Sequence, residues 1–290
     1  MSTSPRLLVT GASGQLGRLV IQSLLKTVPA ARIVATVRTL AKATDLQALG
    51  VEVREADYDQ PAVLDAAFQG IDRLLLISSS EIGRRVPQHR NAIDAAVRAG
   101  VGLIGYTSLL HGDASPLPLK AEHVATEAAL RASGAPFVIL RNGWYLENYN
   151  GFIAPGLEHG AVFGSAGEGR IAAAARADYA DAAAAVLAAG AEHAGKIYEL
   201  AGDDGFTMAD WAAALSEVAG KVVAYNNLPE ADYKALLINI GLPAPVADLL
   251  SSSDVGAAQG GLYDASRTLS RLIGRPTTPL KTALAAALKG

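Results

Sequence analysis

The sequence predicts an α/β protein whose first half is a doubly wound parallel sheet, and three observations lead to that fold class. Short runs rich in leucine and β-branched residues alternate with segments of helical periodicity, as in strand–helix–strand units. The run 73–78 is almost continuously apolar, which is typical of a strand buried on both faces. A glycine-rich segment joins the first strand to the first helix. Together these features indicate parallel strands with helices on both faces of the sheet.

Each expected element of the first half follows from its own local pattern. In the first helix, Leu16, Val20 and Leu24 recur every four residues along one face. Pro61 suits the first turn of the third helix, where its missing N–H group costs nothing. Strands are expected at residues 6–10, 33–38, 51–56, 73–78, 102–107 and 137–141, and helices at residues 15–25, 40–49, 61–68, 88–99 and 120–132.

The pattern changes after residue 150. Glycine-rich turns are expected around 164–169, and a strand is expected at 196–200. Residues 207–210 resemble a capping box and predict a helix that continues to Val218. Residues 230–288 are expected to form short helices separated by proline and glycine.

Composition excludes several classes of function. Half of the 290 residues are apolar and 18% are charged, which predicts a compact globular protein. The net charge of −3, without a basic cluster, argues against a nucleic-acid partner. Because there is no cysteine, disulfides and thiol catalysis are excluded. The five histidines lack metal-ligand spacing, so no metal site is expected.

The sequence gives no reason to expect a secreted or membrane-inserted protein. The segment Met1–Thr10 lacks the basic and apolar regions of a signal peptide. The alanine-rich stretch 172–191 is hydropathic, but Arg176, Asp178 and Asp181 would make a bilayer span costly. We therefore predict a buried helix over 172–191 and a cytoplasmic location.

The glycine-rich segment 11–17 is the strongest functional signal. It follows an apolar strand and opens an amphipathic helix, which is the context of a dinucleotide-binding turn of the Rossmann type. Its first glycine permits the sharp turn, the second lets the backbone approach a pyrophosphate, and the third lets the helix pack on the sheet. An ordinary strand–helix turn can also contain three glycines. The expected cofactor-binding residues here are Gly11, Ala12, Ser13, Gly14, Gln15, Leu16 and Gly17.

The end of the second strand predicts which cofactor binds. A cofactor with a free ribose 2′-hydroxyl usually meets an acidic residue there, whereas this chain has Arg38, with Lys42 one helical turn later. A guanidinium suits a 2′-phosphate, so we expect NADPH (NADP) as the cofactor, in preference to NADH. The alternative is that Arg38 lies in solvent at a strand end.

Polar residues also follow the third and fourth strands. Asp57 and Tyr58 end the third strand, and Ser78, Ser79 and Ser80 follow the fourth. Ligands of open α/β sheets bind at the carboxyl ends of the strands. We therefore expect Asp57, Tyr58, Ser78 and Ser79 to line the dinucleotide site.

A set of motifs spread over nearly the whole chain carries a family resemblance. They are the glycine segment 11–17 and residues 36–38, 106–111, 140–149, 176–179, 198–202, 253–257 and 272–278. Together they resemble the NmrA-like branch of the atypical short-chain dehydrogenases/reductases. Within that branch the chain is most similar to the type-2 NAD(P)H:quinone oxidoreductases, and triphenylmethane-dye reductases are near relatives.

The resemblance implies a two-lobed oxidoreductase. Residues 1–150, rejoined by a helix at about 176–190, are expected to form the NADPH-binding Rossmann domain, and 151–290 a smaller α/β substrate-binding lobe. It adds Thr107 and Ser108 to the cofactor-binding residues and a small aromatic acceptor, such as a quinone, as the partner. Two alternatives stay open: a dye or azo reductase, and a non-catalytic NADP(H)-binding redox sensor. The sequence also leaves homo-oligomerisation open.

A missing tyrosine favours a quinone acceptor. Ordinary short-chain dehydrogenases use Tyr-x-x-x-Lys to protonate an alkoxide, but here Pro116 stands four residues before Lys120. An aliphatic alcohol has a pKa roughly six units above that of a quinol, which is about 10, and this corresponds to roughly 8 kcal/mol in anion stabilisation. A quinone therefore tolerates the loss of the tyrosine, whereas an aliphatic ketone does not.

The remaining site candidates lie near the sixth strand and on the preceding helix. Asn142 and Lys120 are the predicted catalytic residues: Asn142 is expected to hydrogen-bond the nicotinamide or an acceptor oxygen, and Lys120 to reach the cleft from a helix face that it shares with His123. Trp144, Tyr145 and His123 are the predicted acceptor-binding residues. The alternatives are that the aromatic side chains only pack between lobes and that Lys120 and His123 lie on a solvated helix surface.

Overall fold

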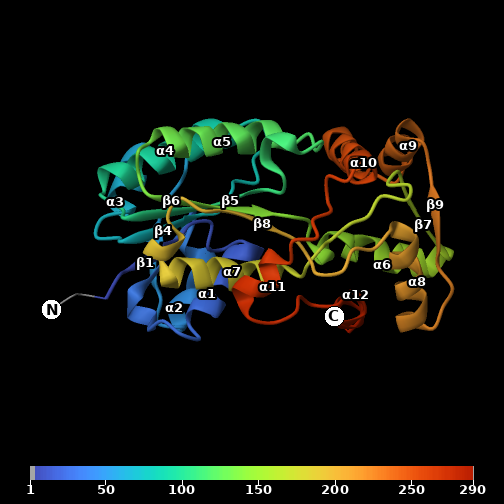
Figure 1. Cartoon of the computed structure of the whole chain (residues 1–290), viewed down its shortest axis with the longest axis horizontal. Coiled ribbons are helices and arrows are strands. Elements are labelled where there is room, and N and C mark those ends of the chain that lie inside the picture. Colours follow the sequence, from blue (N-terminus) through green and yellow to red (C-terminus); the bar gives the residue numbers. More distant parts are fainter. Residues whose placement is uncertain (1–3, 290) are drawn as a thin grey trace. The chain divides into compact units, whose positions relative to one another are not determined.

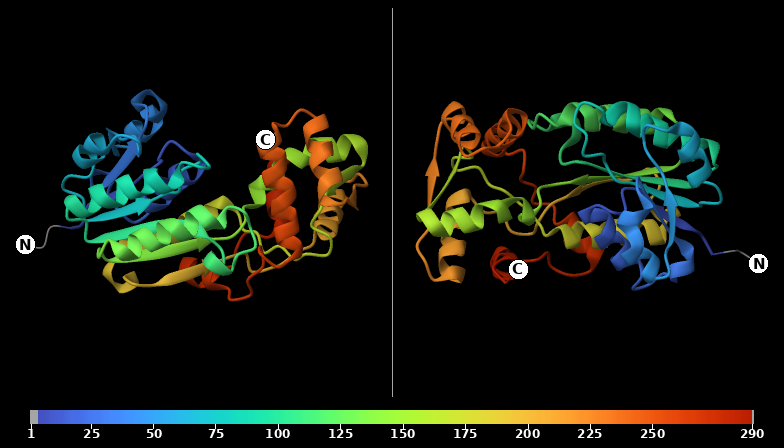
Figure 2. Two further views of the ribbon diagram at one scale, coloured as in Figure 1. Left: turned by 90° about the horizontal axis from the view of Figure 1, so that it is seen from above. Right: turned by 180° about the vertical axis from the view of Figure 1, so that it is seen from behind.

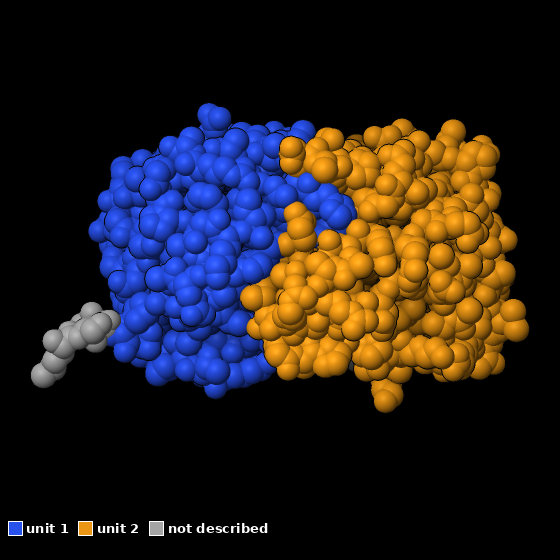
Figure 3. All heavy atoms as spheres, viewed as in Figure 1, with its two compact units in different colours: residues 1–112, 121–142, 176–198 blue, residues 113–120, 143–175, 199–290 orange. Residues whose placement is uncertain are grey.

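The computed structural model describes residues 4–289 and divides into two compact units (Figure 3). Unit 1 comprises Met1–Gly112, Ala121–Asn142 and Arg176–Tyr198, and unit 2 comprises the remainder. Residues 1–3, which begin both the predicted Rossmann domain and the amino-terminal segment 1–10, lie outside the described residues. Gly290, at the end of the predicted second lobe, lies outside them too.

Unit 1 is built on a doubly wound sheet, as the sequence predicts. The strand order is β3-β2-β1-β4-β5-β6-β8, and every neighbouring pair from β3 to β6 is parallel. The order reverses between β1 and β4, which is the switch point where such sheets bind ligands. The strands are β1 (Leu7–Val9), β2 (Ile33–Val37), β3 (Glu52–Glu55), β4 (Arg73–Leu76), β5 (Leu103–Leu109), β6 (Phe137–Asn142) and β8 (Ile197–Leu200).

Helices cover both faces of this sheet. Figures 1 and 2 show α3, α4 and α5 on one face and α1 and α7 on the other. Against the first face, the side chains of Phe68, Ala92 and Leu130 pack on sheet residues such as Ile104 and Ile139. The helices are α1 (Gln15–Leu24), α2 (Thr44–Ala48), α3 (Pro61–Ala67), α4 (Arg85–Arg98), α5 (Lys120–Ala132) and α7 (Arg176–Ala189).

Two helices of unit 1 differ from the sequence prediction. The helix expected at 40–49 is a 3-10 turn, Leu40–Ala43, followed by the short α2. The helix expected at 88–99 already begins at Arg85, before Pro87. Proline is accepted there because the first turn of a helix has no intrahelical partners for its N–H groups.

Unit 2 contains a small parallel sheet that the sequence does not predict. Strands β7 (Ala161–Gly164) and β9 (Ala224–Asn227) pair in parallel, and α6 (Asn150–His159) leads into β7. Four-residue strands without clear alternation give little periodic signal. The other helices of unit 2 are α8 (Met208–Ala219), α9 (Glu230–Asn239), α10 (Ala244–Ala258), α11 (Thr268–Ile273) and α12 (Leu280–Ala287).

The predicted capping box at the start of α8 is confirmed. Thr207 Oγ1 accepts a hydrogen bond from the Asp210 N–H at 3.1 Å, and Asp210 Oδ2 accepts one from the Thr207 N–H at 2.9 Å. Reciprocal bonds of this kind satisfy N–H groups that a helix end otherwise leaves without partners.

The helix predicted over 172–191 is shorter in the structure. Residues 172–175 are not helical, and α7 begins at Arg176 and ends at Ala189. The Ala172 N–H donates to Leu262 O at 2.8 Å, and the Ala174 N–H donates to Trp144 O at 3.2 Å. These long-range backbone bonds outweigh the helix propensity of alanine. No helix within residues 4–289 has both the length and the apolar character needed to cross a membrane.

Candidate nucleotide-binding site

A pocket of about 250 Å³ lies in unit 1 at the carboxyl ends of β1 to β4. It is at the point where the strand order reverses. Most residues predicted for the cofactor line it, and they come from sequence segments far apart. They are Gly11, Ser13, Gly14, Gln15, Leu16, Gly17, Arg38, Asp57, Tyr58, Ser78 and Ser79. The pocket is completed by Thr36, Val37, Ala56, Ile77, Ser80, Glu81 and Gln88.

Each glycine of the 11–17 loop occupies a position that disfavours a side chain, by its backbone conformation at Gly11 and by close backbone atoms at Gly14 and Gly17. Gly11 has a φ of +58°, a conformation that favours glycine. A Cβ on Gly17 would lie 2.5 Å from Gly11 O and 2.7 Å from Ala12 Cα. A Cβ on Gly14 would lie 3.1 Å from the same Gly11 oxygen. The third glycine therefore allows α1 to start directly against the turn.

The amino-terminal end of α1 is available to an anion. Its N-cap residue, Gly14, has no side chain to bond the first N–H groups, and the first turn carries no acidic residue. Free N–H groups and the positive end of the helix dipole favour a phosphate at such a position. Ala12 is fully buried behind the loop and donates its N–H to Thr36 O at 3.0 Å.

Arg18, which the sequence analysis missed, fastens the loop to the segment after β2. Its Nε donates to Ser13 O at 3.1 Å, and its Nη2 donates to Lys42 O at 2.7 Å. Its Nη1 contacts Asp45. Lys42 thus enters the network through its carbonyl oxygen, and its exposed side chain does not line the pocket. An arginine four residues after Gly14 carries no motif by which it could be recognised.

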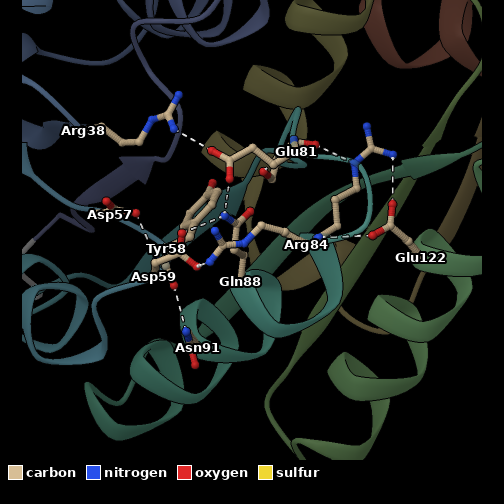
Figure 4. A network of polar contacts seen from close by, with 11 residues as sticks. Arg38, Asp57, Tyr58, Asp59, Glu81, Arg84, Gln88, Asn91 and Glu122 are labelled. Carbon is tan, nitrogen blue, oxygen red and sulfur yellow. Dashed lines mark hydrogen bonds and ion pairs between the residues drawn. The ribbon is translucent and has the colours of Figure 1, made fainter. Parts of the chain in front are cut away.

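Arg38 lies at the rim of the pocket and is paired with Glu81 (Figure 4). Arg38 Nη1 lies 2.6 Å from Glu81 Oε1, and the two side chains are 65% and 34% exposed. Glu81 belongs to the segment between β4 and α4, directly after the predicted serines. The rule that ligands bind at strand ends could have included Glu81.

Tyr58 forms part of the pocket wall through buried hydrogen bonds. Its hydroxyl lies 2.6 Å from Thr10 Oγ1 and 2.9 Å from Ile77 O. Burial raises the pKa of Tyr58, and the hydrogen bond with Thr10 offsets only part of that effect. Asp57 accepts the Asp59 N–H at 3.0 Å through Oδ1. Tyr58 is therefore a neutral wall residue at physiological pH.

The serine segment after β4 is fixed by buried side chains. The Ser78 N–H donates to Thr107 Oγ1 at 2.9 Å, and the Ser79 N–H donates to His89 Nε2 at 2.9 Å. His89 Nδ1 lies 2.9 Å from Thr126 Oγ1. Thr107 thus supports the pocket from behind without lining it. His89 was not predicted, because a histidine inside a helix gives no positional signal.

His89 is neutral in this arrangement. Thr126 Oγ1 donates a hydrogen bond to Glu122 O at 2.8 Å, so it accepts one from the Nδ1–H of His89. Nε2 then carries no proton and accepts the hydrogen bond from the Ser79 N–H. Burial, together with the nearby His123 and Arg85, lowers the pKa of His89 to about 3.

Ser108 takes part in a separate buried cluster. Its Oγ donates to Glu127 Oε1 at 2.7 Å, and it does not line the pocket. Burial raises the pKa of Glu127, but hydrogen bonds from Arg141 and Ser108 outweigh this effect and hold it below its usual value.

The residues predicted for the acceptor are distributed over both units. Asn142 ends β6 in unit 1 and is buried, and the division between units falls directly after it. Trp144 and Tyr145 belong to unit 2 and are partly buried. Lys120 also belongs to unit 2, where its Nζ lies 3.4 Å from Asp113 O.

His123 lies in the interior of unit 1. The residue is 5% exposed, and its Nδ1 lies 2.8 Å from the Tyr106 hydroxyl. Burial lowers the pKa of His123 to about 4. A role for His123 toward the acceptor stays a prediction. Within residues 4–289 no group of three or more His, Asp or Glu side chains is arranged to hold a metal ion.

Residues 3–278 match the NmrA-like family. The chain belongs to that family. This NmrA-like protein is 58% identical over 272 residues to quinone oxidoreductase 2 of Escherichia coli (strain K12), covering 94% of this chain and 95% of the relative.

Solved structures agree with this family relationship. The NADPH-dependent quinone oxidoreductase of Escherichia coli, crystallised with NADPH, has a TM-score of 0.95 and 56% identity over 97% of this chain and 99% of that chain. The Citrobacter sp. triphenylmethane reductase complexed with NADP(H) has a TM-score of 0.93 and 39% identity, again over 97% and 99% of the two chains. The Rossmann-type fold predicted from the sequence is confirmed.

Proposed function

We propose that this NmrA-like protein is an NADPH-dependent quinone reductase. The observation that carries the proposal is the 58% identity, over 94% of the chain, to a protein named quinone oxidoreductase 2. The pocket independently supports the cofactor in this proposal, because a glycine loop, a helix amino terminus and an arginine at the end of β2 line one cavity. These are the groups that a 2′-phosphorylated dinucleotide requires.

The residues of unit 1 fit this cofactor. The loop 11–17 would hold the pyrophosphate, since glycine at positions 14 and 17 keeps the turn and the helix start free of side-chain atoms. Arg38 would meet the 2′-phosphate with its planar set of donors. Asp57, Ser78 and Ser79 would complete the wall along the nucleotide. We also propose that unit 2 supplies residues for the acceptor.

The chemistry needs little from the protein beyond binding and orientation. When bound, NADPH supplies a hydride to the acceptor. The chain has Pro116 at the place of the usual proton-donating tyrosine, four residues before Lys120. Hydride transfer to a quinone gives a quinol anion. The pKa of a quinol is near 10, roughly six units below that of an aliphatic alcohol, so the quinol anion needs about 8 kcal/mol less stabilisation than an alkoxide. A quinone acceptor is consistent with this active site.

Asn142 and Lys120 are proposed to donate hydrogen bonds to the reacting groups, and Trp144 and Tyr145 to stack against a planar ring. If Asn142 acts on the reacting groups, Asn142→Ala should lower kcat by about 10-fold or more while the Kd for NADPH stays within about twofold. Loss of NADPH binding in this variant would instead assign Asn142 to the fold or to the cofactor.

The function is tested by anaerobic NADPH oxidation with a benzoquinone, a naphthoquinone, an aliphatic ketone, a triphenylmethane dye and no acceptor. Turnover of the quinones but not of the ketone is the expected result. Rapid ketone turnover would contradict the proposed acceptor chemistry. Tight NADPH binding without turnover of any acceptor would contradict an enzymatic role and favour a redox sensor.

Dye reduction is a second candidate, because the triphenylmethane reductase of Citrobacter sp. aligns with 97% of the chain at a TM-score of 0.93. The two candidate functions are distinguished by comparing the kcat/KM of the protein for the dye with its kcat/KM for the quinones under the same conditions. A higher kcat/KM for the dye than for either quinone would favour the dye.

A further inference from the structure

The rim of the pocket carries an acidic residue that opposes the proposed cofactor. Glu81 Oε1 lies 2.6 Å from Arg38 Nη1, and both residues line the pocket. Arg38 is the cation expected to meet the 2′-phosphate, so its guanidinium already has an anionic partner from the protein itself. Figure 4 shows the two side chains pointing toward one another from separate segments, Arg38 after β2 and Glu81 after β4.

Glu81 is not a freely moving surface carboxylate. Its Oε2 accepts a hydrogen bond from Gln88 Nε2 at 2.9 Å, and its N–H donates to Ser79 Oγ at 3.1 Å. Gln88 is 2% exposed. The buried amide of Gln88 therefore holds the Glu81 carboxylate in place at the rim. Because Glu81 is already ordered, pairing with Arg38 costs it less side-chain entropy than a surface ion pair usually does.

Gln88 also bonds a second carboxylate, which provides an internal comparison. Gln88 Nε2 lies 3.1 Å from Asp59 Oδ2, and Asp59 Oδ1 pairs with Arg84 Nη2 at 2.9 Å. Asp59 does not line the pocket and does not pair with Arg38. Glu81 and Asp59 thus share one support, but only Glu81 faces the expected phosphate.

We propose that Glu81 competes with the cofactor's 2′-phosphate for Arg38, and that it thereby sets the affinity and the selectivity for NADP(H). This inference rests on the proposed NADPH cofactor. A 2′-phosphate must displace the carboxylate from the guanidinium of Arg38, and that displacement costs affinity. A nucleotide with a 2′-hydroxyl does not meet this cost, so Glu81 makes the difference in affinity between NADP(H) and NAD(H) smaller.

Isothermal titration calorimetry tests the proposal without turnover, by measuring the Kd of the protein for adenosine 2′,5′-bisphosphate and for 5′-ADP. Replacing Glu81 by glutamine keeps the hydrogen-bonding capacity toward Gln88 and removes the charge. Glu81→Gln should lower the Kd for the bisphosphate by about fivefold or more, and change the Kd for 5′-ADP by less than about twofold. The matched control Asp59→Asn removes the same charge from the other side of Gln88 and should leave both Kd values unchanged.

The double variant Arg38→Gln/Glu81→Gln shows whether the effect of Glu81 on the Kd for the bisphosphate depends on Arg38. When Arg38 is already replaced by glutamine, adding Glu81→Gln should change the Kd for the bisphosphate by less than about twofold. An unchanged or higher bisphosphate Kd in the single variant, an equal effect of Asp59→Asn, or a full effect in the Arg38→Gln background would each overturn the proposal. If the wild-type protein binds neither ligand, the proposed cofactor itself fails, which is a distinguishable result.

Discussion

Arg141 makes two parallel hydrogen bonds to the buried carboxylate of Glu127, from Nε to Oε1 at 2.9 Å and from Nη2 to Oε2 at 2.8 Å. Glu127 lies on α5 and is 1% exposed, and Arg141 lies on β6 one residue before Asn142. A Cβ on Gly112 would lie 2.3 Å from Arg141 Cζ, so the guanidinium also needs glycine at that position. The pair thus fixes the carboxyl end of β6.

Glu127→Gln should lower the free energy of unfolding by about 2–4 kcal/mol, because it removes the buried carboxylate charge that the guanidinium of Arg141 bonds twice. Urea denaturation measures this change as a shift of the midpoint, with one m-value used for all variants. Arg131→Gln is the control. Arg131 makes a single 3.0 Å contact with Glu127, and its side chain is 42% exposed, so the loss should stay below about 1 kcal/mol. Equal losses in both variants would contradict the assignment.

Arg38→Gln should raise the Kd for NADP⁺ by about 10- to 100-fold, because charge-assisted hydrogen bonds to the 2′-phosphate are lost. The Kd for NAD⁺ should change by less than about threefold. Arg90→Gln removes the same charge from an exposed position of α4 outside the pocket and should have no effect. An equal loss of affinity for both cofactors would show that Arg38 does not bind the 2′-phosphate.

Gly17→Ala should abolish tight nucleotide binding and lower the free energy of unfolding by about 1–3 kcal/mol, since the added Cβ meets backbone atoms that cannot move aside. Gly151→Ala is the matched control. Gly151 is also helical, in α6, and a Cβ there meets nothing within 4 Å. That variant should be neutral or more stable by up to about 1 kcal/mol. Full nucleotide affinity in Gly17→Ala would be incompatible with the proposed loop.

The stability of the protein should depend on the protonation of His89. Burial lowers the pKa of this imidazole from 6.5 to about 3. Because the folded-state pKa is the lower one, the contribution of the neutral ring is complete above about pH 6.5 and is lost as the pH falls toward 3. At about 1.4 kcal/mol per pH unit, the loss between about pH 6.5 and pH 5 is about 2 kcal/mol.

This prediction is measured as a difference between two denaturation series. His89→Gln should flatten the dependence of the unfolding free energy on pH over that range, relative to the wild type. His159→Gln replaces an exposed histidine at the end of α6 and should leave the dependence unchanged. Parallel profiles for the wild type and His89→Gln would contradict the neutral, buried state of the ring.

The order of elements and much of the pocket were predictable because their signals are local. Apolar strands alternating with helices, and a glycine loop after the first strand, depend on residues close together in the chain. The carboxyl ends of parallel strands meet at one edge, so Arg38, Asp57 and Ser78 could be placed in one pocket before the structure was known.

The supporting residues of the pocket could not be found in this way. Arg18 acts through carbonyl oxygens of Ser13 and Lys42, and His89 acts through an N–H group of Ser79. Backbone groups occur at every position, so a side chain that binds one has no partner residue type by which to recognise it. The same reason explains the shorter α7, where backbone bonds to Leu262 and Trp144 keep residues 172–175 out of the helix.

The sequence by itself determined the fold class, the place of the glycine loop and the cation expected at the 2′-phosphate, because each depends on periodicity or on position at a strand end. Only the tertiary structure decided that Glu81 faces Arg38, since the two residues are 43 positions apart and lie after different strands. The attraction between two charges depends on their separation in space, and that separation is set by the packing of the sheet.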